Sequence, residues 1–145
     1  MTLRDVIIGR AKVIVGGLAE GEALISSQPI TFFGGVDART GEVIEGGHEI
    51  RGERLSRRVL VFPHGKGSTV GSYVLYSLAK RGVAPAAIIN ARFDAIIASG
   101  CIISGIPLLI APGKSLARIR KGDMMLIDGR VGRIVVLGRG SRKRP

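Results

Sequence analysis

The segment 62–72 reads Phe-Pro-His-Gly-Lys-Gly-Ser-Thr-Val-Gly-Ser and gathers small, cationic and hydroxyl-bearing residues in one short loop. It follows a wholly apolar run, which predicts a buried strand, and it precedes a helical pattern. Open α/β sheets bind ligands at such strand ends. Gly65 and Gly67 would let the backbone approach a ligand, while free N–H groups of the helix start and Lys66 would favour an anion. The loop indicates an anion site, although an ordinary capped helix after a glycine-rich turn would have the same pattern.

Two better-known loop motifs do not fit these residues. A Walker phosphate loop needs Ser or Thr directly after its Gly-Lys pair, where this chain has Gly67, and a leading Gly, where it has Leu60. A nucleophile elbow has the form Gly-x-Ser-x-Gly, and Val70 occupies its last glycine position. Neither of these two chemistries is predicted.

The other residues with metal-binding or nucleophilic side chains are few and scattered. His48 and His64 each lack a second ligand at metal spacing, so no zinc role is predicted for either. His64 adjoins the loop and could tune a bound anion, or it is a plain surface histidine. Cys101 is the single cysteine, so this chain alone can form no disulfide, zinc site or iron–sulfur site. Because it lies in an isoleucine-rich segment, we expect it in the core.

The composition is that of one globular domain, with 145 residues of which 46% are hydrophobic and 23% charged. The net charge is +11, and from position 114 onward ten basic residues against Asp123 and Asp128 supply +8 of it. Such a charge favours nucleic acid, an anionic substrate or an acidic partner, or it is simply solvated. No aromatic residues are interleaved with the basic ones, which argues against nucleic acid. We expect a second basic run to face solvent or a subunit, namely Arg51, Arg54, Arg57 and Arg58.

The pattern of apolar residues predicts an α/β domain with a parallel core. Short β-branched runs separated by glycine pairs predict strands at 6–8, 13–15 and 30–33. The middle of the chain predicts strand, helix, strand, helix and strand, at 59–62, about 68–81, 86–89, 94–104 and 108–110. This order implies parallel pairing with right-handed crossovers.

Particular residues predict where these elements begin and end. Ser68 or Thr69 is expected to cap the first helix, Gly82 to end it, and Asp94 to cap the second helix. Strands at 124–127 and 131–137 around the pair Asp128-Gly129 predict a closing hairpin with a tight turn.

The domain is expected to span 1–138, followed by a basic tail at 139–145 that includes Arg142, Lys143 and Arg144. No signal peptide is predicted, because Arg10 and Lys12 interrupt the first apolar run. The uncharged stretch 95–113 contains prolines and predicts a buried helix followed by a strand instead of a membrane span. We therefore expect a cytoplasmic protein, and its scarcity of Asn and Gln is typical of a thermophile.

Several motifs in order along nearly the whole chain resemble the small-subunit or swivel domain of the aconitase X family. The first is Phe-Gly-Gly-Val-Asp-Ala-Arg-Thr-Gly-Glu-Val-Ile at 33–44, followed by His48 and Gly52. The others are Val-Leu-Val-Phe-Pro at 59–63, Gly-Lys-Gly-Ser at 65–68, and Ala-Pro-Ala-Ala-Ile-Ile-Asn at 84–90.

The resemblance implies a swivelling β/β/α domain and a hydro-lyase that is active only with a separate large subunit. The archaeal two-subunit form of this family removes water from (R)-5-phosphomevalonate, giving trans-anhydromevalonate 5-phosphate in a mevalonate pathway. Its large subunit carries a [4Fe–4S] cluster on its own cysteines, so no metal ligand is expected here. The expected partners are therefore the large subunit and a phosphorylated hydroxy acid, with neither nucleic acid nor membrane.

The resemblance also implies roles for individual residues. Ser68 falls where the family places the catalytic serine base, and Gly65, Lys66, Gly67 and Thr69 are the implied substrate-binding residues. Aconitases proper follow this serine with Ser-Arg, and the arginine binds a substrate carboxylate. Here Thr69 and Val70 follow, so carboxylate recognition is expected elsewhere, on the large subunit. His64 and Glu49 also replace the residues that the family pattern has there.

Two alternatives remain open from the sequence. The chain could serve an aconitase X-type dehydratase for another hydroxy acid, of the hydroxyproline type. It could instead be a non-catalytic basic module that binds RNA or acts as a scaffold, which a steep salt dependence of nucleic-acid affinity would reveal.

Overall fold

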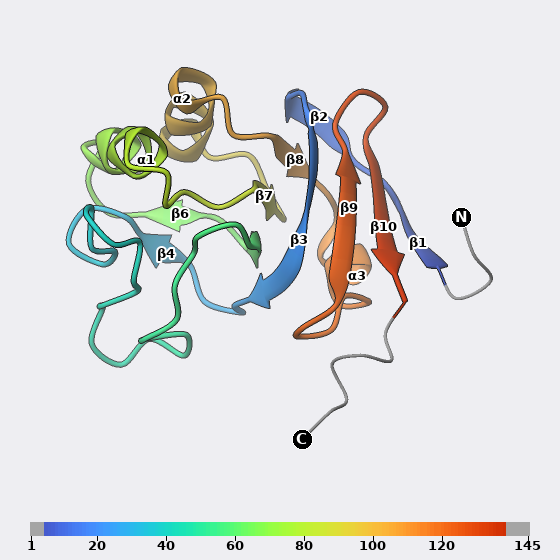
Figure 1. Ribbon diagram of the computed structural model, residues 1–145, viewed down its shortest axis with the longest axis horizontal. Coiled ribbons are helices and arrows are strands. Elements are labelled where there is room, and N and C mark those ends of the chain that lie inside the picture. The colour runs from blue at the N-terminus through green and yellow to red at the C-terminus, as the bar shows by residue number, and fades with distance from the viewer. Residues whose placement is uncertain (1–4, 139–145) are drawn as a thin grey trace.

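The computed structural model describes residues 5–138, and its central feature is an eight-stranded mixed sheet in the order β1-β10-β9-β3-β5-β7-β8-β2 (Figure 1). These strands are β1 (Asp5–Arg10), β2 (Lys12–Val15), β3 (Leu18–Ile25), β5 (Val59–Phe62), β7 (Ala87–Asn90), β8 (Leu108–Ile110), β9 (Met124–Asp128) and β10 (Arg133–Leu137). A short pair, β4 (Ile30–Thr31) and β6 (Gly65–Lys66), stands apart from this sheet. The helices are α1 (Gly71–Lys80), α2 (Ala95–Ser104) and α3 (Gly113–Leu116).

The parallel core has the predicted βαβαβ order, with β5, β7 and β8 as neighbours joined through α1 and α2. β5 pairs with β7 from Val59↔Ala87 to Phe62↔Asn90, and β7 pairs with β8 from Ile88↔Leu108. All four residues of β5 and of β7 are buried, as the wholly apolar run at 59–62 predicted.

One long strand, β3, belongs to two differently built halves of the sheet. Its first five residues pair antiparallel with β9, and its last three pair parallel with β5. β1 and β2 stand at opposite ends of the strand order although only Ala11 separates them in sequence. The sheet therefore curls until its two outer strands are joined through one residue.

Side chains that alternate along the parallel strands pack into two separate hydrophobic cores. Leu60, Ile88 and Leu108 pack under α1 and α2, whereas Val61, Ile89 and Leu109 face the inside of the curled sheet with residues of β9 and β10. The layers are thus helices, parallel strands and an antiparallel hairpin, which confirms the predicted α/β fold.

The second helix agrees closely with the sequence prediction. Asp94 Oδ1 accepts the N–H groups of Ile96 at 2.9 Å and Ile97 at 3.1 Å, and Gly105 ends the helix with a left-handed φ of 71°.

The first helix begins later than predicted, at Gly71, and it has no side-chain cap. Ser68 Oγ accepts the N–H of Val70 at 3.1 Å and so stabilises a turn that precedes the helix. The helix ends at Lys80, and Gly82 follows with a φ of 73°.

Other boundaries also differ from the predictions. The hairpin strands are confirmed, but their loop has four residues, 129–132, because Asp128 pairs directly with Arg133. Of 30–33 only Ile30–Thr31 is a strand. Both β3 and α3 were missed by the sequence analysis. The predicted basic tail at 139–145 lies outside the described residues.

Candidate active site

The Gly-Lys-Gly-Ser loop lies in the connection between β5 and α1, at the carboxyl end of the parallel strands. After Phe62 the chain passes Pro63 and His64, forms β6, and turns through 67–70 into α1. β6 pairs in parallel with β4, in the register Ile30↔Gly65 and Thr31↔Lys66. The loop therefore has a defined backbone before it reaches Ser68.

Both glycines of the loop are required by their surroundings. A Cβ on Gly67 would lie 2.2 Å from Thr31 Oγ1, and the φ of Gly67 is 88°. A Cβ on Gly65 would lie 2.8 Å from the Ile97 side chain. The glycines thus allow the loop to pack tightly against β4 and against the start of α2.

Ser68 is exposed, and its hydroxyl accepts one hydrogen bond, from Val70 N–H, without donating to any described residue. The next serine, Ser72, differs because its Oγ donates to the carbonyl of Thr69 at 3.1 Å. The backbone N–H groups of Ser68 and Thr69 have no acceptor among the described residues. Free N–H groups, which the sequence predicted at the helix start, therefore lie in the turn before α1. At the start of α1 itself, the N–H groups of Gly71, Ser72 and Tyr73 are bonded to carbonyls three residues back.

Lys66, predicted to favour an anion, is paired with an acidic residue. Its Nζ lies 3.0 Å from Glu45 Oε2, and the two side chains are 46% and 24% exposed. Glu45 Oε1 is buried without a hydrogen-bond partner among the described residues. The ammonium has three donors, so Lys66 can bind a second acceptor, but its positive charge is already balanced by the Glu45 carboxylate.

The residues that follow Glu45 hold its segment in place through hydrogen bonds. Glu49 accepts the N–H of Ser27 at 2.8 Å and its hydroxyl at 2.7 Å, and these bonds, the N–H bond first, lower the pKa of the Glu49 carboxyl. The nearby His48 is buried, accepts the Ile50 N–H on Nδ1, and donates from Nε2 to the Pro29 carbonyl at 3.0 Å. His48 is therefore a structural histidine.

His64 and Arg92 meet beside the loop. Arg92 Nη2 lies 3.2 Å from His64 Nε2, and His64 Nδ1 lies 2.7 Å from the Gly65 carbonyl. Arg92 lies two residues beyond the end of β7, after Ala91, at the same edge of the sheet as the loop. His64 thus contacts both the loop backbone and Arg92 and is not an isolated surface histidine.

Cys101 lies in the core under α2, as predicted. Burial raises the pKa of its thiol to about 12, so the thiolate that metals and electrophiles require is strongly disfavoured. Among residues 5–138, no group of three His, Cys, Asp or Glu side chains could hold a metal ion.

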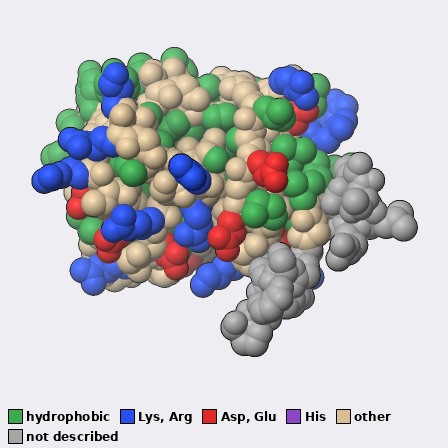
Figure 2. Space-filling view, viewed as in Figure 1, with side chains coloured by type: hydrophobic (Ala, Val, Ile, Leu, Met, Phe, Trp, Pro, Cys, Tyr) green, Lys and Arg blue, Asp and Glu red, His purple; other side chains and the backbone are tan. Residues whose placement is uncertain are grey.

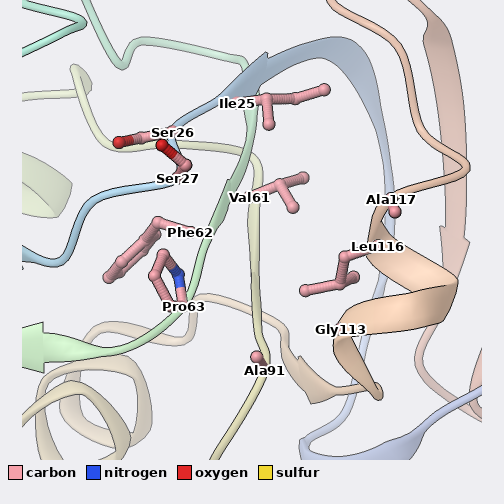
Figure 3. A pocket seen from close by; sticks show the side chains of 10 residues that line it. All are labelled: Ile25, Ser26, Ser27, Val61, Phe62, Pro63, Ala91, Gly113, Leu116 and Ala117. Atoms are coloured by element: carbon pink, nitrogen blue, oxygen red, sulfur yellow. The ribbon is translucent and has the colours of Figure 1, made fainter.

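Two hollows adjoin the loop. A cavity of about 270 Å³ opens at the ends of β3, β5 and β7 against α3, and its lining is mostly apolar, with Ser26 and Ser27 at one side (Figure 3). A smaller, polar hollow of about 160 Å³ lies between the Glu45–Lys66 pair, His48 and Gln28. Ser68 lines neither, so it stands on an open surface.

Basic side chains are spread over the face shown in Figure 2, with acidic ones among them, and form no single patch there. Of the predicted basic run, Arg51, Arg54 and Arg57 are exposed, and Arg58 pairs with Glu53 at 3.2 Å. None of the described helices is both long and apolar enough to cross a membrane.

Sequence reasoning brought together the loop residues but missed Glu45, Arg92 and Thr31, which contact that loop from distant parts of the chain. A partial signal existed for Arg92, because it lies shortly after the parallel strand predicted at 86–89, as the loop follows the strand at 59–62. Glu45 and Thr31 carried none, since their contacts depend on how irregular segments fold back.

Comparison with known proteins identifies relatives over nearly the whole chain. A family model described as the aconitase X swivel domain matches residues 8–136. The phosphomevalonate dehydratase small subunit of Methanosarcina mazei is 51% identical over 132 residues, covering 90% of this chain and 92% of that protein. The protein of the same name from Pyrococcus furiosus is 44% identical over 131 residues, covering 90% of this chain and 96% of that protein.

Solved structures agree with these sequence relatives. The crystal structure of Thermococcus kodakaraensis aconitase X in its holo-form has a TM-score of 0.84 and 43% identity, covering 88% of this chain and 96% of that chain. A solution NMR structure of a UPF0107 protein has a TM-score of 0.82 and 45% identity, covering 89% of this chain and 98% of that chain. The resemblance drawn from the motifs is confirmed, and this chain belongs to the aconitase X swivel domain family.

Proposed function

We propose that this chain is the small subunit of a cytoplasmic hydro-lyase that converts (R)-5-phosphomevalonate into trans-anhydromevalonate 5-phosphate. The observation that carries the proposal is the 51% identity, over 90% of this chain, to a protein named phosphomevalonate dehydratase small subunit. The exposed Ser68 on a loop with a well-defined backbone gives this chain a residue suited to take part in the reaction.

In the proposed reaction Ser68 accepts the proton from the carbon next to the substrate carboxylate. The C–H bond breaks and its electron pair forms the carbon–carbon double bond, while the C–O bond on the neighbouring carbon breaks and its oxygen leaves as hydroxide, which becomes water by taking a proton from solvent. A serine hydroxyl is a weak base unless its deprotonated form is stabilised. The unpaired N–H groups of Ser68 and Thr69 and the ammonium of Lys66 are the nearby groups that can stabilise negative charge.

The substrate-binding residues in this proposal are Gly65, Lys66, Gly67 and Thr69. The glycines let the loop pack closely against Thr31 and Ile97, which sets the position of the backbone that a substrate would contact. Thr69 is exposed, and its hydroxyl has no hydrogen-bond partner among the described residues. Lys66 keeps two of its three donors after bonding Glu45.

The residues of this chain do not fit an iron–sulfur cluster. Cluster irons are held by cysteine thiolates, whereas Cys101 is single, buried and held in its protonated form. We therefore propose that a [4Fe–4S] cluster is carried by the large subunit, and that this chain contributes the proton transfer.

The proposal is tested by anaerobic assay of 5-phosphomevalonate with this chain, with its large subunit, and with both, after reconstitution with iron. We expect the two chains to form a complex and only that mixture to release the anhydro acid. A complex without turnover would instead favour another hydroxy acid as substrate. The absence of any complex would reject the two-subunit enzyme.

A further inference from the structure

Arg92 has a charge that no acidic residue of the described chain neutralises. The ion pairs within residues 5–138 are Lys66–Glu45, Arg58–Glu53 and Arg130–Asp128, and Arg92 belongs to none of them. Its guanidinium bonds instead to an uncharged group, the Nε2 of His64, at 3.2 Å. A cation held in this way keeps its full charge and most of its five N–H donors available for a ligand.

The geometry fixes both the tautomer of His64 and the direction of Arg92. An arginine nitrogen can only donate, so His64 Nε2 must accept, and the ring proton then lies on Nδ1. That proton is donated to the Gly65 carbonyl, since the two atoms lie 2.7 Å apart. His64 therefore links the start of β6 to the side chain of Arg92.

The backbones on either side of this contact are also joined. The N–H groups of Ala91 and Arg92 both donate to the Pro63 carbonyl, at 2.9 and 3.3 Å, and Asn90 Nδ2 donates to the Phe62 carbonyl at 3.0 Å. The strand ends that carry Arg92 and the serine loop are thus held at a fixed separation. The Arg92 side chain is thus held in one orientation before a ligand binds, which reduces the conformational entropy that is lost on binding.

Arg92 lies within reach of a substrate bound at Ser68. Ser68 is four positions beyond His64, and four residues of extended chain span at most about 14 Å. A phosphorylated hydroxy acid has a carboxylate next to the reacting carbon and a phosphate at the other end. With the reacting carbon at Ser68, the phosphate would be bound several bonds away from the serine turn.

We propose that Arg92, oriented by His64, binds the phosphate of the substrate. This inference rests on the proposed function and adds a binding residue, and a positioning residue behind it, to that site. Arginine suits the role because its planar donors match phosphate oxygens two at a time. Arg92 would also supply an unpaired positive charge for the phosphate, whereas Lys66 is already paired with Glu45.

The test compares Arg92→Ala with Arg81→Ala, an exposed arginine beyond the end of α1, in complexes with the large subunit. Arg92→Ala should raise the KM for 5-phosphomevalonate about 10- to 100-fold with little change in kcat, since a charged hydrogen bond to the phosphate is lost. Mevalonate, which lacks the phosphate, should inhibit both enzymes with the same Ki. Arg81→Ala should resemble the wild type.

His64 is tested as a positioning residue by two replacements. His64→Leu removes the nitrogen that accepts the Arg92 hydrogen bond and should raise the KM toward the value of Arg92→Ala. His64→Gln offers a side-chain oxygen as acceptor, so its KM should lie closer to that of the wild type. In the double variant His64→Leu/Arg92→Ala the two effects should not add, because both act through one guanidinium.

An unchanged KM in Arg92→Ala, or an equal rise in the Ki of mevalonate, would overturn the inference while leaving the hydro-lyase in place. To keep the two proposals separate, the Kd of 5-phosphomevalonate is also measured by calorimetry in complexes that carry Ser68→Ala. A wild-type complex that binds the compound without turnover would refute the proposed reaction, and the Kd ratio would still decide the role of Arg92. No binding by any complex would overturn both.

Discussion

Gly67 and Gly34 have almost the same backbone φ, 88° and 87°, but different surroundings. A Cβ on Gly67 would lie 2.2 Å from Thr31 Oγ1, whereas a Cβ on Gly34 would meet nothing within 4 Å. Gly34→Ala should therefore cost only the backbone strain, about 1–2 kcal/mol of unfolding free energy. Gly67→Ala should cost about 1–3 kcal/mol more, because Thr31 must move.

Urea denaturation of the two variants measures this difference. Adding Thr31→Ala to Gly67→Ala should recover part of the loss, since the atom nearest to the new methyl group is removed. Equal destabilisation by Gly67→Ala and Gly34→Ala would show that the loop does not pack against β4 as the structure has it.

At this scale the sequence predicted what depends on neighbouring residues. The Asp94 cap and the burial of Cys101 were predictable, because the first is set within one helical turn and the second by an apolar segment. The partners of Lys66 and His64 were not, since Glu45 lies 21 positions away and Arg92 lies 28 positions away. Such pairs depend on the tertiary fold, which periodicity does not encode.

At the scale of elements, α2 has a side-chain cap and α1 has none, which makes a direct comparison possible. Asp94→Ala should lower the free energy of unfolding by about 0.5–2 kcal/mol, because the N–H groups of Ile96 and Ile97 lose their acceptor. Asp94→Asn keeps an acceptor and should lose little. Thr69→Ala should leave the stability unchanged, since the Thr69 side chain caps nothing.

Thermal or urea unfolding of these three variants checks the comparison. A loss of stability in Thr69→Ala as large as that in Asp94→Ala would contradict the observed start of α1 at Gly71 and support the cap that the sequence predicted.

The βαβαβ order was predictable because the strands at 59–62 and 108–110 are apolar throughout, and apolar residues at helical spacing lie between them. β3 was missed for two reasons. It is built from Leu, Ala, Gly and Glu, which have low strand propensity, with Ile25 its single β-branched residue. It also changes partners along its length, and Gly21 is needed where a Cβ would lie 2.5 Å from the Arg57 carbonyl oxygen.

At the scale of the whole molecule, the curled sheet separates an inner core from the edge where the candidate site lies. The inner core holds β9 and β10 against the parallel strands, while the helices cover the opposite face. The loops after β5 and β7 emerge at one edge, and there Ser68 stands exposed, outside both hollows. Because Ser68 is exposed and lines neither hollow, we propose that a large subunit completes the site around it.

The most direct measurement is the turnover of 5-phosphomevalonate by the large subunit with Ser68→Ala, using Ser72→Ala as the matched control. The two serines are four positions apart in sequence, but only the Ser72 hydroxyl donates to a carbonyl, that of Thr69. We predict that Ser68→Ala lowers kcat by about 100- to 10,000-fold while subunit association stays intact, and that Ser72→Ala stays close to the wild type. Turnover by Ser68→Ala within about tenfold of the wild type would contradict the assignment of Ser68 as the proton acceptor.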